Sequence, residues 1–154
     1  LLTPDSKDSA MKTKTFAFTI ATLVNLTLPL SARADSELST YQALGEKPGL
    51  VKIMDDFMGN LLADARTRPF FEKADQTRIK EQLVVQFCAV LGGPCTYEGA
   101  PMGPIHASLG IRQEHFNALV EDLQLAMDKQ GVPFRAQNKL LAKLAPMHRE
   151  IITR

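Results

Sequence analysis

The stretch MGPIHASLGI, residues 102–111, carries the strongest structural signal in this 154-residue chain. It places His106 in a short apolar segment, with Pro104 before it and Gly110 after it. Because proline and glycine interrupt regular structure, we expect only a brief helical turn around the histidine. A neutral imidazole in such a place uses one ring nitrogen for a hydrogen bond and offers the other to a ligand. The alternative for His106 is an ordinary structural histidine.

Helical periodicity runs through the chain on both sides of this stretch. Four longer segments repeat apolar residues at the three–four spacing of amphipathic helices: residues 50–62, 75–91, 116–127 and 140–151. A short helix is expected before them, capped by Ser36 or Ser39 and ended by Gly45. Pro146 falls inside the last segment, where it should kink the helix or open a turn. Since no segment alternates with period two for long, the sequence predicts an all-α domain.

Residues 92–104 interrupt the helices with a stretch rich in glycine and proline. We expect this stretch to be mostly loop. Connections in helical bundles are usually short, and a loop of about a dozen residues is uncommon without a function. A loop laid against a bound planar group would have such a function.

The first 34 residues have the pattern of a targeting segment. Residues 1–10 read as a polar upstream extension, and a basic start at Met11 leads to an apolar run over residues 16–30 and a small-x-small motif ending at Ala34. A run of about 15 residues fits a cleavable signal peptide and is shorter than the roughly 20 that a membrane span needs. We therefore expect a domain at residues 35–154 that is exported to the bacterial periplasm and free of the membrane after cleavage.

The charge balance argues against a nucleic-acid-binding protein, and the spacing of the histidines argues against a zinc protein. The chain has 18 basic and 17 acidic side chains, and residues 1–34 hold four and two of them, so the expected domain has a formal charge of −1. It has no basic stripe, and nucleic-acid binding therefore lacks electrostatic support. The three histidines lie on separate segments, without the ligand spacing of a zinc site.

Cys88 and Cys95 are the two cysteines of the chain. Cys88 lies near the end of an expected helix and Cys95 just past the Gly92–Pro94 turn, so a disulfide is sterically possible. An oxidising compartment and an even number of cysteines favour the bridge. The alternative is a buried apolar Cys88 and an exposed Cys95 thiol, and the sequence leaves both open.

Taken in order, the motifs of residues 38–153 resemble a truncated haemoglobin of the first group. Each motif alone is weak, and the resemblance rests on the ordered set: DDF at 55–57, LAD at 62–64, PFF at 69–71, LGGP at 91–94, YEG at 97–99, GAPM at 99–102, LGI at 109–111, HF at 115–116 and GVP at 131–133. The resemblance implies a shortened globin, a two-over-two helical sandwich around haem b. It also implies that His106 is the proximal ligand of the haem iron.

The same resemblance assigns further residues to the haem pocket. It implies that the Phe71 ring packs on the haem face and that Arg78 lies near the propionates, where a guanidinium can pair with a carboxylate. The other implied wall positions are Met102, Ile111, Phe116 and Leu119. Phe71 is equally compatible with an ordinary core role, and Arg78 with a solvated helix face.

His148 lies on the apolar stripe of the last helix, two residues after Pro146. Cyanobacterial relatives carry a histidine at this spacing that can bond covalently to a haem vinyl group. The resemblance therefore makes His148 a candidate for a covalent link. The alternative is that His148 caps or shields a polar group.

The distal side departs from the pattern of the family. The implied distal positions are Phe57, Met58, Ile79, Gln82, Leu83 and Gln86. Many relatives have a tyrosine at Met58 and a glutamine at Leu83, and cyanobacterial relatives have an iron-binding histidine at Gln82. An amide cannot replace that ligand, so we do not expect six-coordination through imidazole. Met58 as a sixth ligand is conceivable, but a mid-helix thioether is more often core filler.

Gln82 and Gln86 are the remaining candidate donors to a bound gas. The alternative for both is a polar helix face. If neither reaches the gas, oxygen loses a hydrogen bond worth roughly 1 kcal/mol. Oxygen should then dissociate faster and the iron oxidise more easily, whereas carbon monoxide should be little affected.

The expected function is reversible binding of oxygen, nitric oxide or carbon monoxide by a monomer. Nitric oxide dioxygenase or peroxidase-like side activity is possible, but dioxygenation needs an unidentified reductase and the chain has no flavin or nicotinamide motif. The alternative from another class is an exported all-helical interaction module without a cofactor. An absorption band near the blue edge of the visible spectrum would separate the two.

Overall fold

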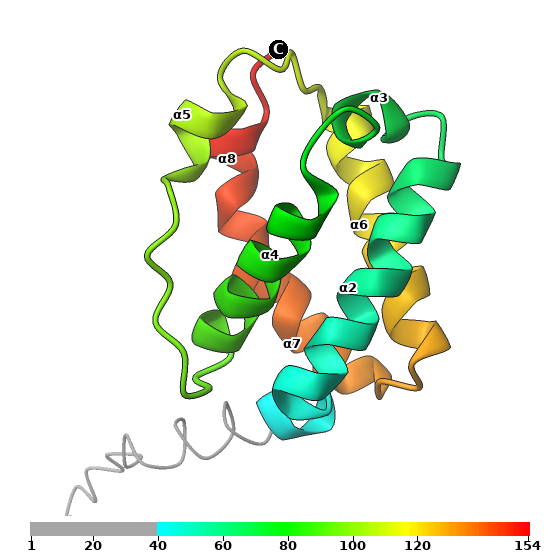
Figure 1. The fold of residues 1–154 in the computed structure, drawn as a ribbon, viewed down its shortest axis with the longest axis vertical. Coiled ribbons are helices and arrows are strands. Elements are labelled where there is room, and N and C mark those ends of the chain that lie inside the picture. The colour runs from blue at the N-terminus through cyan, green and yellow to red at the C-terminus, as the bar shows by residue number, and fades with distance from the viewer. Residues whose placement is uncertain (1–39) are drawn as a thin grey trace, which may run out of the picture.

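The computed structural model describes residues 40–154, and these form helices and loops without a strand (Figure 1). Residues 40–43 are helical and end at a turn before Gly45. The later helices are α2 (Glu46–Ala63), α3 (Arg68–Phe71), α4 (Gln76–Val90), α5 (Met102–His106), α6 (Gln113–Lys129), α7 (Phe134–Leu144), the 3-10 helix η1 (Ala145–Met147) and α8 (His148–Ile151). The expected signal peptide and the caps Ser36 and Ser39 lie outside the described residues.

The four long helices pack in two layers. Helix α2 packs against both α4 and α6, while α7 contacts α4 and α6 (Figure 1). The short helix α5 packs against α8 at one end of the molecule. None of the helices within residues 40–154 is long and apolar enough to cross a membrane.

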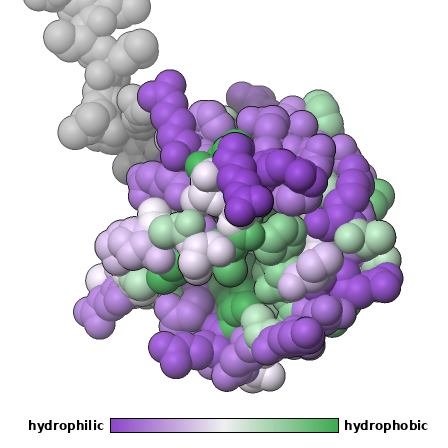
Figure 2. All heavy atoms as spheres, turned by 90° about the horizontal axis from the view of Figure 1, so that it is seen from above, coloured by the Kyte–Doolittle hydropathy of each residue, from purple (hydrophilic) through white to green (hydrophobic). Residues whose placement is uncertain are grey.

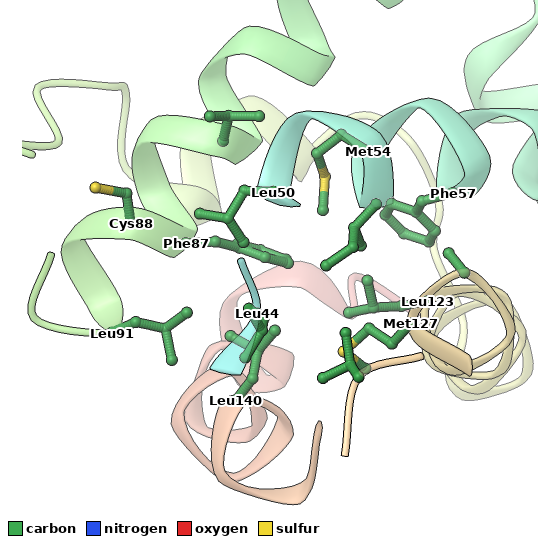
Figure 3. Packing of buried hydrophobic residues seen from close by; sticks show 14 of the residues in the cluster. Leu44, Leu50, Met54, Phe57, Phe87, Cys88, Leu91, Leu123, Met127 and Leu140 are labelled. Carbon is green, nitrogen blue, oxygen red and sulfur yellow. The ribbon is translucent and has the colours of Figure 1, made fainter. Parts of the chain in front are cut away.

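The core lies where the apolar faces of these helices meet. Leu50 and Phe57 from α2, Phe87 from α4, Leu123 from α6 and Leu140 from α7 converge there (Figure 3). Each of the five is at most 3% exposed. This burial of apolar surface supplies the main driving force for the fold.

Local signals set where the helices begin and end. The Asp75 side chain accepts a hydrogen bond from the Arg78 backbone N–H at 3.0 Å and caps α4. At the end of α6, Gly131 has φ 68°, and the Val132 N–H donates to the Met127 carbonyl at 3.0 Å. Such a left-handed residue followed by a backward bond is a Schellman ending, which favours glycine. Gly131 therefore ends α6.

Pro146 and Pro104 affect the helices around them in different ways. Pro146 opens a 3-10 turn between α7 and α8, as we expected. The expected brief turn around His106 is confirmed by the five-residue α5, but Pro104 does not interrupt the helix before His106, because α5 begins at Met102 and includes Pro104. The backbone N–H groups of a first turn have no partner within the helix, so a proline there removes no hydrogen bond.

The structure resolves the alternative for the cysteines in favour of the bridge. Cys88 and Cys95 form a disulfide with a Cα–Cα distance of 5.7 Å. It joins the last turn of α4 to the loop that leads to α5. No free cysteine occurs among residues 40–154.

Candidate functional site

His106 is the last residue of α5, and its ring is half-buried. Its Nδ1 lies 2.7 Å from the Met102 carbonyl oxygen, one turn earlier in the same helix. A carbonyl can only accept, so Nδ1 carries the proton and donates, which leaves the lone pair on Nε2. The sequence predicted such a backbone hydrogen bond, and the geometry confirms it. The arrangement is that of an imidazole oriented to offer Nε2 to a metal.

Helices α4 and α5 approach each other where Gln86 meets Met102, and the region that the two helices border is called the cleft below. Met102 and His106 are four residues apart and share one face of α5, whereas Ile79, Leu83 and Gln86 share one face of α4. The amide Nε2 of Gln86 lies 4.0 Å from the Met102 sulfur. The α4 face and the α5 face therefore point toward the same space.

The walls of this cleft are apolar but incompletely covered. Phe71, Ile79, Leu83, Leu119 and Leu144 pack against the core and remain half-buried. Met102 and Phe116 are also half-buried, and Ile111 is buried. Figure 2, seen from the end that carries α3 and α5, shows apolar side chains gathered in a hollow that polar side chains surround. Large apolar side chains left half-exposed around a hollow mark a surface suited to a bound apolar molecule.

The two candidate glutamines of α4 occupy different environments. Gln82 is exposed, and Gln86 is 6% exposed. The position of Gln82 on the outer face of α4 therefore does not support contact with a ligand in the cleft. Gln86 faces inward and contacts Met147 as well as Met102.

Phe57 and Met58 lie on the buried face of α2 and are 3% and 5% exposed. Both belong to the continuous hydrophobic core. Their side chains bring no hydrogen-bond donor to the interior, as the sequence analysis expected for Met58.

The positions of Arg78 and His148 are compatible with the alternative roles given for them above. The exposed Arg78 lies in the first turn of α4. The half-buried His148 has Nδ1 2.8 Å from the Ala145 carbonyl oxygen, and its ring centroid lies 6.1 Å from that of Phe116. His148 thus shields a backbone carbonyl, which was the alternative to a covalent link, while its Nε2 is left for other contacts.

Two parts of this region were not predicted from the sequence. Met147 was assigned to the apolar stripe of the last helix but not to the site, although its sulfur lies 3.6 Å from Gln86 Nε2. The backbone N–H groups of Thr153 and Arg154 both donate to the Ile111 carbonyl and hold the C-terminal segment against the start of α6. The position of Met147 on the stripe was the available signal, whereas nothing in the sequence pointed to the C-terminal contact.

A separate groove of about 400 Å³ lies between α2 and α4. Its lining residues are Lys47, Val51, Met54, Asp55, Thr77, Lys80, Glu81, Val84 and Val85. They include none of the residues expected at the site, because they lie on another face of α4. Within residues 40–154 no three His, Cys, Asp or Glu side chains are grouped so as to hold a metal ion.

The fold matches solved truncated hemoglobins. A structure of truncated hemoglobin from Tetrahymena pyriformis, in the Fe(III) form, has a TM-score of 0.71 at 24% identity, covering 75% of this chain and 98% of that one. The 2/2 hemoglobin from Synechococcus, solved in the cyanomet state with covalently attached heme, has a TM-score of 0.69 at 22% identity, with 75% and 98% coverage. The expected two-over-two helical sandwich is thus confirmed, and fold and cleft together define a small globin.

The sequence comparisons identify the family. The chain belongs to the bacterial-like globin family, whose sequence profile matches residues 39–153. The group 1 truncated hemoglobin GlbN of Mycolicibacterium paratuberculosis is 35% identical over 115 residues, covering 75% of this chain and 85% of that protein. The protein of the same name from a Nostoc species is 27% identical over 114 residues, with 74% and 97% coverage.

Proposed function

We propose that this domain binds haem through Nε2 of His106 and reversibly holds a diatomic gas, namely oxygen, nitric oxide or carbon monoxide. The hydrogen bond between Nδ1 and the Met102 carbonyl, at 2.7 Å, is the observation that carries the proposal. It fixes the tautomer and the ring orientation of a neutral imidazole, and a donated hydrogen bond of this kind raises the basicity of the other nitrogen. Membership of the globin family supports the same function.

The residues of the cleft fit haem b. A porphyrin is a large, flat, apolar group, and the half-buried side chains Phe71, Leu83 and Leu119 are the kind of surface that it would cover. Met102 and Phe116 would contribute walls on the His106 side. The exposed Arg78 guanidinium would pair with a propionate at the rim. Haem bound there would supply the iron that binds the gas.

The chain itself performs three tasks in this function. His106 binds the iron, and its hydrogen bond to Met102 prevents the ring from rotating. The apolar walls exclude water, which slows oxidation of ferrous iron. We propose that the domain acts as a monomer whose main role is gas binding, with dioxygenase or peroxidase-like chemistry as a side activity at most.

Absorption spectra of protein produced with ample haem precursor test the proposal. We expect a strong band near the blue edge of the visible spectrum, lost or shifted in His106→Ala and partly restored by added imidazole. His115→Ala is a matched control, since His115 is also half-buried but its Nδ1 accepts a hydrogen bond from the Arg112 backbone at 3.2 Å. A colourless but folded native protein would contradict the proposal and favour a cofactor-free interaction module.

The same sample tests the role of His148. A covalent link from His148 to the haem would keep the pigment with the protein during extraction into acidified organic solvent. Haem released freely into the solvent layer would rule out the covalent link and leave His148 with its contacts to Ala145 and Phe116.

We also propose that residues 1–34 are an upstream extension and a cleavable signal peptide, and that residues 35–154 act in the periplasm. The basic start, the apolar run and the small-x-small motif support this. The Cys88–Cys95 disulfide is consistent with an oxidising compartment. Fractionation of the producing cells and the intact mass of the protein test it. Cleavage after Ala34 gives one definite mass in the periplasmic fraction, whereas protein found only in the cytoplasm, or with residues 1–34 retained, would contradict the proposal.

A further inference from the structure

A buried polar contact joins α6 to the turn that precedes α3. Asp122 of α6 is 4% exposed, and Thr67, the residue before the first turn of α3, is 1% exposed. Asp122 Oδ2 and Thr67 Oγ1 lie 3.2 Å apart. The Asn60 side-chain amide donates to the Asp122 backbone carbonyl at 3.0 Å. The end of α2, the turn and α6 therefore meet at one buried point.

The Thr67 hydroxyl has one proton and several acceptors for it. The Leu61 carbonyl oxygen lies closest to Oγ1, at 2.8 Å, ahead of Asp122 Oδ2 at 3.2 Å and the Asp64 carbonyl oxygen at 3.4 Å. When the hydroxyl donates to Leu61, an ionised Asp122 has no proton in its contact with Thr67, because a carboxylate only accepts. A protonated Asp122 can donate to Oγ1, and both oxygens near the hydroxyl are then satisfied. The geometry thus favours a proton on Asp122.

The charges around Asp122 provide no counter-ion. Its near neighbours Asp64 and Glu121 are like charges, and Arg66 is bound to both of them at 2.7 Å. Arg68, at the start of α3, donates instead to backbone carbonyls at the end of α2. No cation within residues 40–154 forms an ion pair with Asp122. Burial raises the pKa of the Asp122 carboxyl, and the two like charges add to this effect.

This contact lies one helical turn from a wall of the cleft. The Thr67 carbonyl accepts a hydrogen bond from the Phe70 N–H at 3.0 Å and so begins α3. The last residue of α3 is Phe71, the ring that is expected on the haem face. Phe70 also contacts His115 of α6, with ring centroids 5.0 Å apart. The position of this short helix, and with it that of Phe71, therefore depends on contacts with α6.

We propose that Asp122 is a positioning residue for the haem, and that a proton held between Asp122 and Thr67 keeps α3, and so the Phe71 ring, in place against the haem face. The inference rests on the proposed function. When Asp122 releases this proton to solvent, one hydrogen bond is lost, α3 is held less firmly and haem is retained less well. Asp122→Asn keeps an N–H donor at every pH, so this variant imitates the protonated acid.

The experiment measures the rate at which haem passes from the loaded full chain to an excess of a haem-scavenging apoprotein. We expect the native rate, divided by the rate of Asp122→Asn, to rise about three- to tenfold between about pH 5 and pH 8, as the loss of one hydrogen bond implies. Protonation of His106 at low pH is common to both proteins and cancels in this ratio. A ratio that does not change with pH would overturn the proposal.

Variants at Thr67 and Phe71 follow the contact from α6 to the cleft. Thr67→Ser keeps the hydroxyl and should preserve the pH dependence. Thr67→Val removes it, so Asp122→Asn should then have no further effect on haem loss, which a double-mutant cycle measures. Phe71→Leu should likewise reduce the effect of Asp122→Asn, because the ring that the contact positions is absent. An undiminished effect in both cycles would make Asp122 a structural residue only.

Infrared spectra of the haem-free chain report the proton itself. The difference between native protein and Asp122→Asn should contain the band of a protonated carboxylic acid at the lower pH, and this band should fade as the pH rises. Its absence at the lower pH would overturn the proposal. Native protein that takes up no haem would instead refute the proposed function, and with it the effect on haem, whereas the infrared band would still identify the proton on Asp122.

Discussion

At the scale of the residue, Asp122 is a carboxylate placed where its charge is unfavourable. Its side chain is 4% exposed in α6, and Oδ2 accepts a hydrogen bond from the Thr67 hydroxyl at 3.2 Å. Burial raises the pKa of Asp122 above its ordinary value, and the Thr67 hydrogen bond offsets this only in part. The folded chain therefore holds the Asp122 proton more tightly than the unfolded chain. The free energy of unfolding therefore falls as the pH rises from the ordinary pKa of an aspartate through the raised pKa of Asp122, and it stays lower at neutral pH.

We therefore predict that Asp122→Asn raises the free energy of unfolding at pH 7 by about 0.5–1 kcal/mol. The asparagine amide can donate to Thr67, whose hydroxyl already donates to the Leu61 carbonyl at 2.8 Å. Urea unfolding at pH 7 and pH 3 is the measurement, and the advantage should shrink at pH 3. Asp64→Asn is the control of opposite sign, because hydrogen bonds from Arg66 lower the pKa of Asp64. A stabilised Asp64 variant or a destabilised Asp122 variant would contradict this reading.

At the scale of the element, two glycines show that the backbone conformation decides the effect of a substitution. Gly131 ends α6 with φ 68°, whereas Gly59 lies within α2. A Cβ atom added to either residue would meet no other atom within 4 Å. Steric contact with neighbours is thus the same in both cases, and only the backbone differs.

Gly131→Ala should lower the free energy of unfolding by about 1 kcal/mol, because a left-handed conformation is unfavourable for alanine. Gly59→Ala should raise it by a similar amount, since alanine is the better helix former. Urea unfolding of the two variants under one condition measures both signs. Equal effects from both substitutions would show that α6 does not end as described.

At the scale of the whole molecule, the disulfide ties the end of α4 to the start of the loop that leads to α5. Cys88 lies at the end of α4, and Cys95 lies in the loop whose far end is α5 with His106. The Cys88 sulfur is fully buried and contacts the Tyr41 hydroxyl at 3.6 Å, near the start of the described chain. The bridge thus restrains the loop close to one of its two ends.

We predict that Cys95→Ser lowers the free energy of unfolding by about 2 kcal/mol, because the unfolded chain regains the freedom of a short loop. Cys95 is the better position to change, since Cys88 is fully buried in the core and its replacement would also disturb its packing. A dithiol reductant should lower the midpoint of the native protein toward that of the variant. The same reductant should leave the variant unchanged, and native stability that is insensitive to it would contradict the bridge.

The sequence alone determined the all-α class, the four long helices and the position of His106 in a short helical turn. These features depend on local signals, namely apolar spacing, the Gly131 stop and the Pro146 turn, which act within a few residues. The sequence also predicted the backbone hydrogen bond of His106, since it forms within one helical turn. The order of the motifs was sufficient to indicate the family, which the comparisons confirmed.

The tertiary structure decided what depends on contacts between distant elements. Gln82 and Gln86 lie on one helix, and only the packing of α4 against α5 and η1 shows that Gln86 is the buried one. The same packing brought Met147 to the cleft and closed the Cys88–Cys95 bridge, which the sequence had left open. The physical reason is that helical periodicity fixes which residues share a face, whereas the partner of each face is chosen by how the helices bury their apolar surface together.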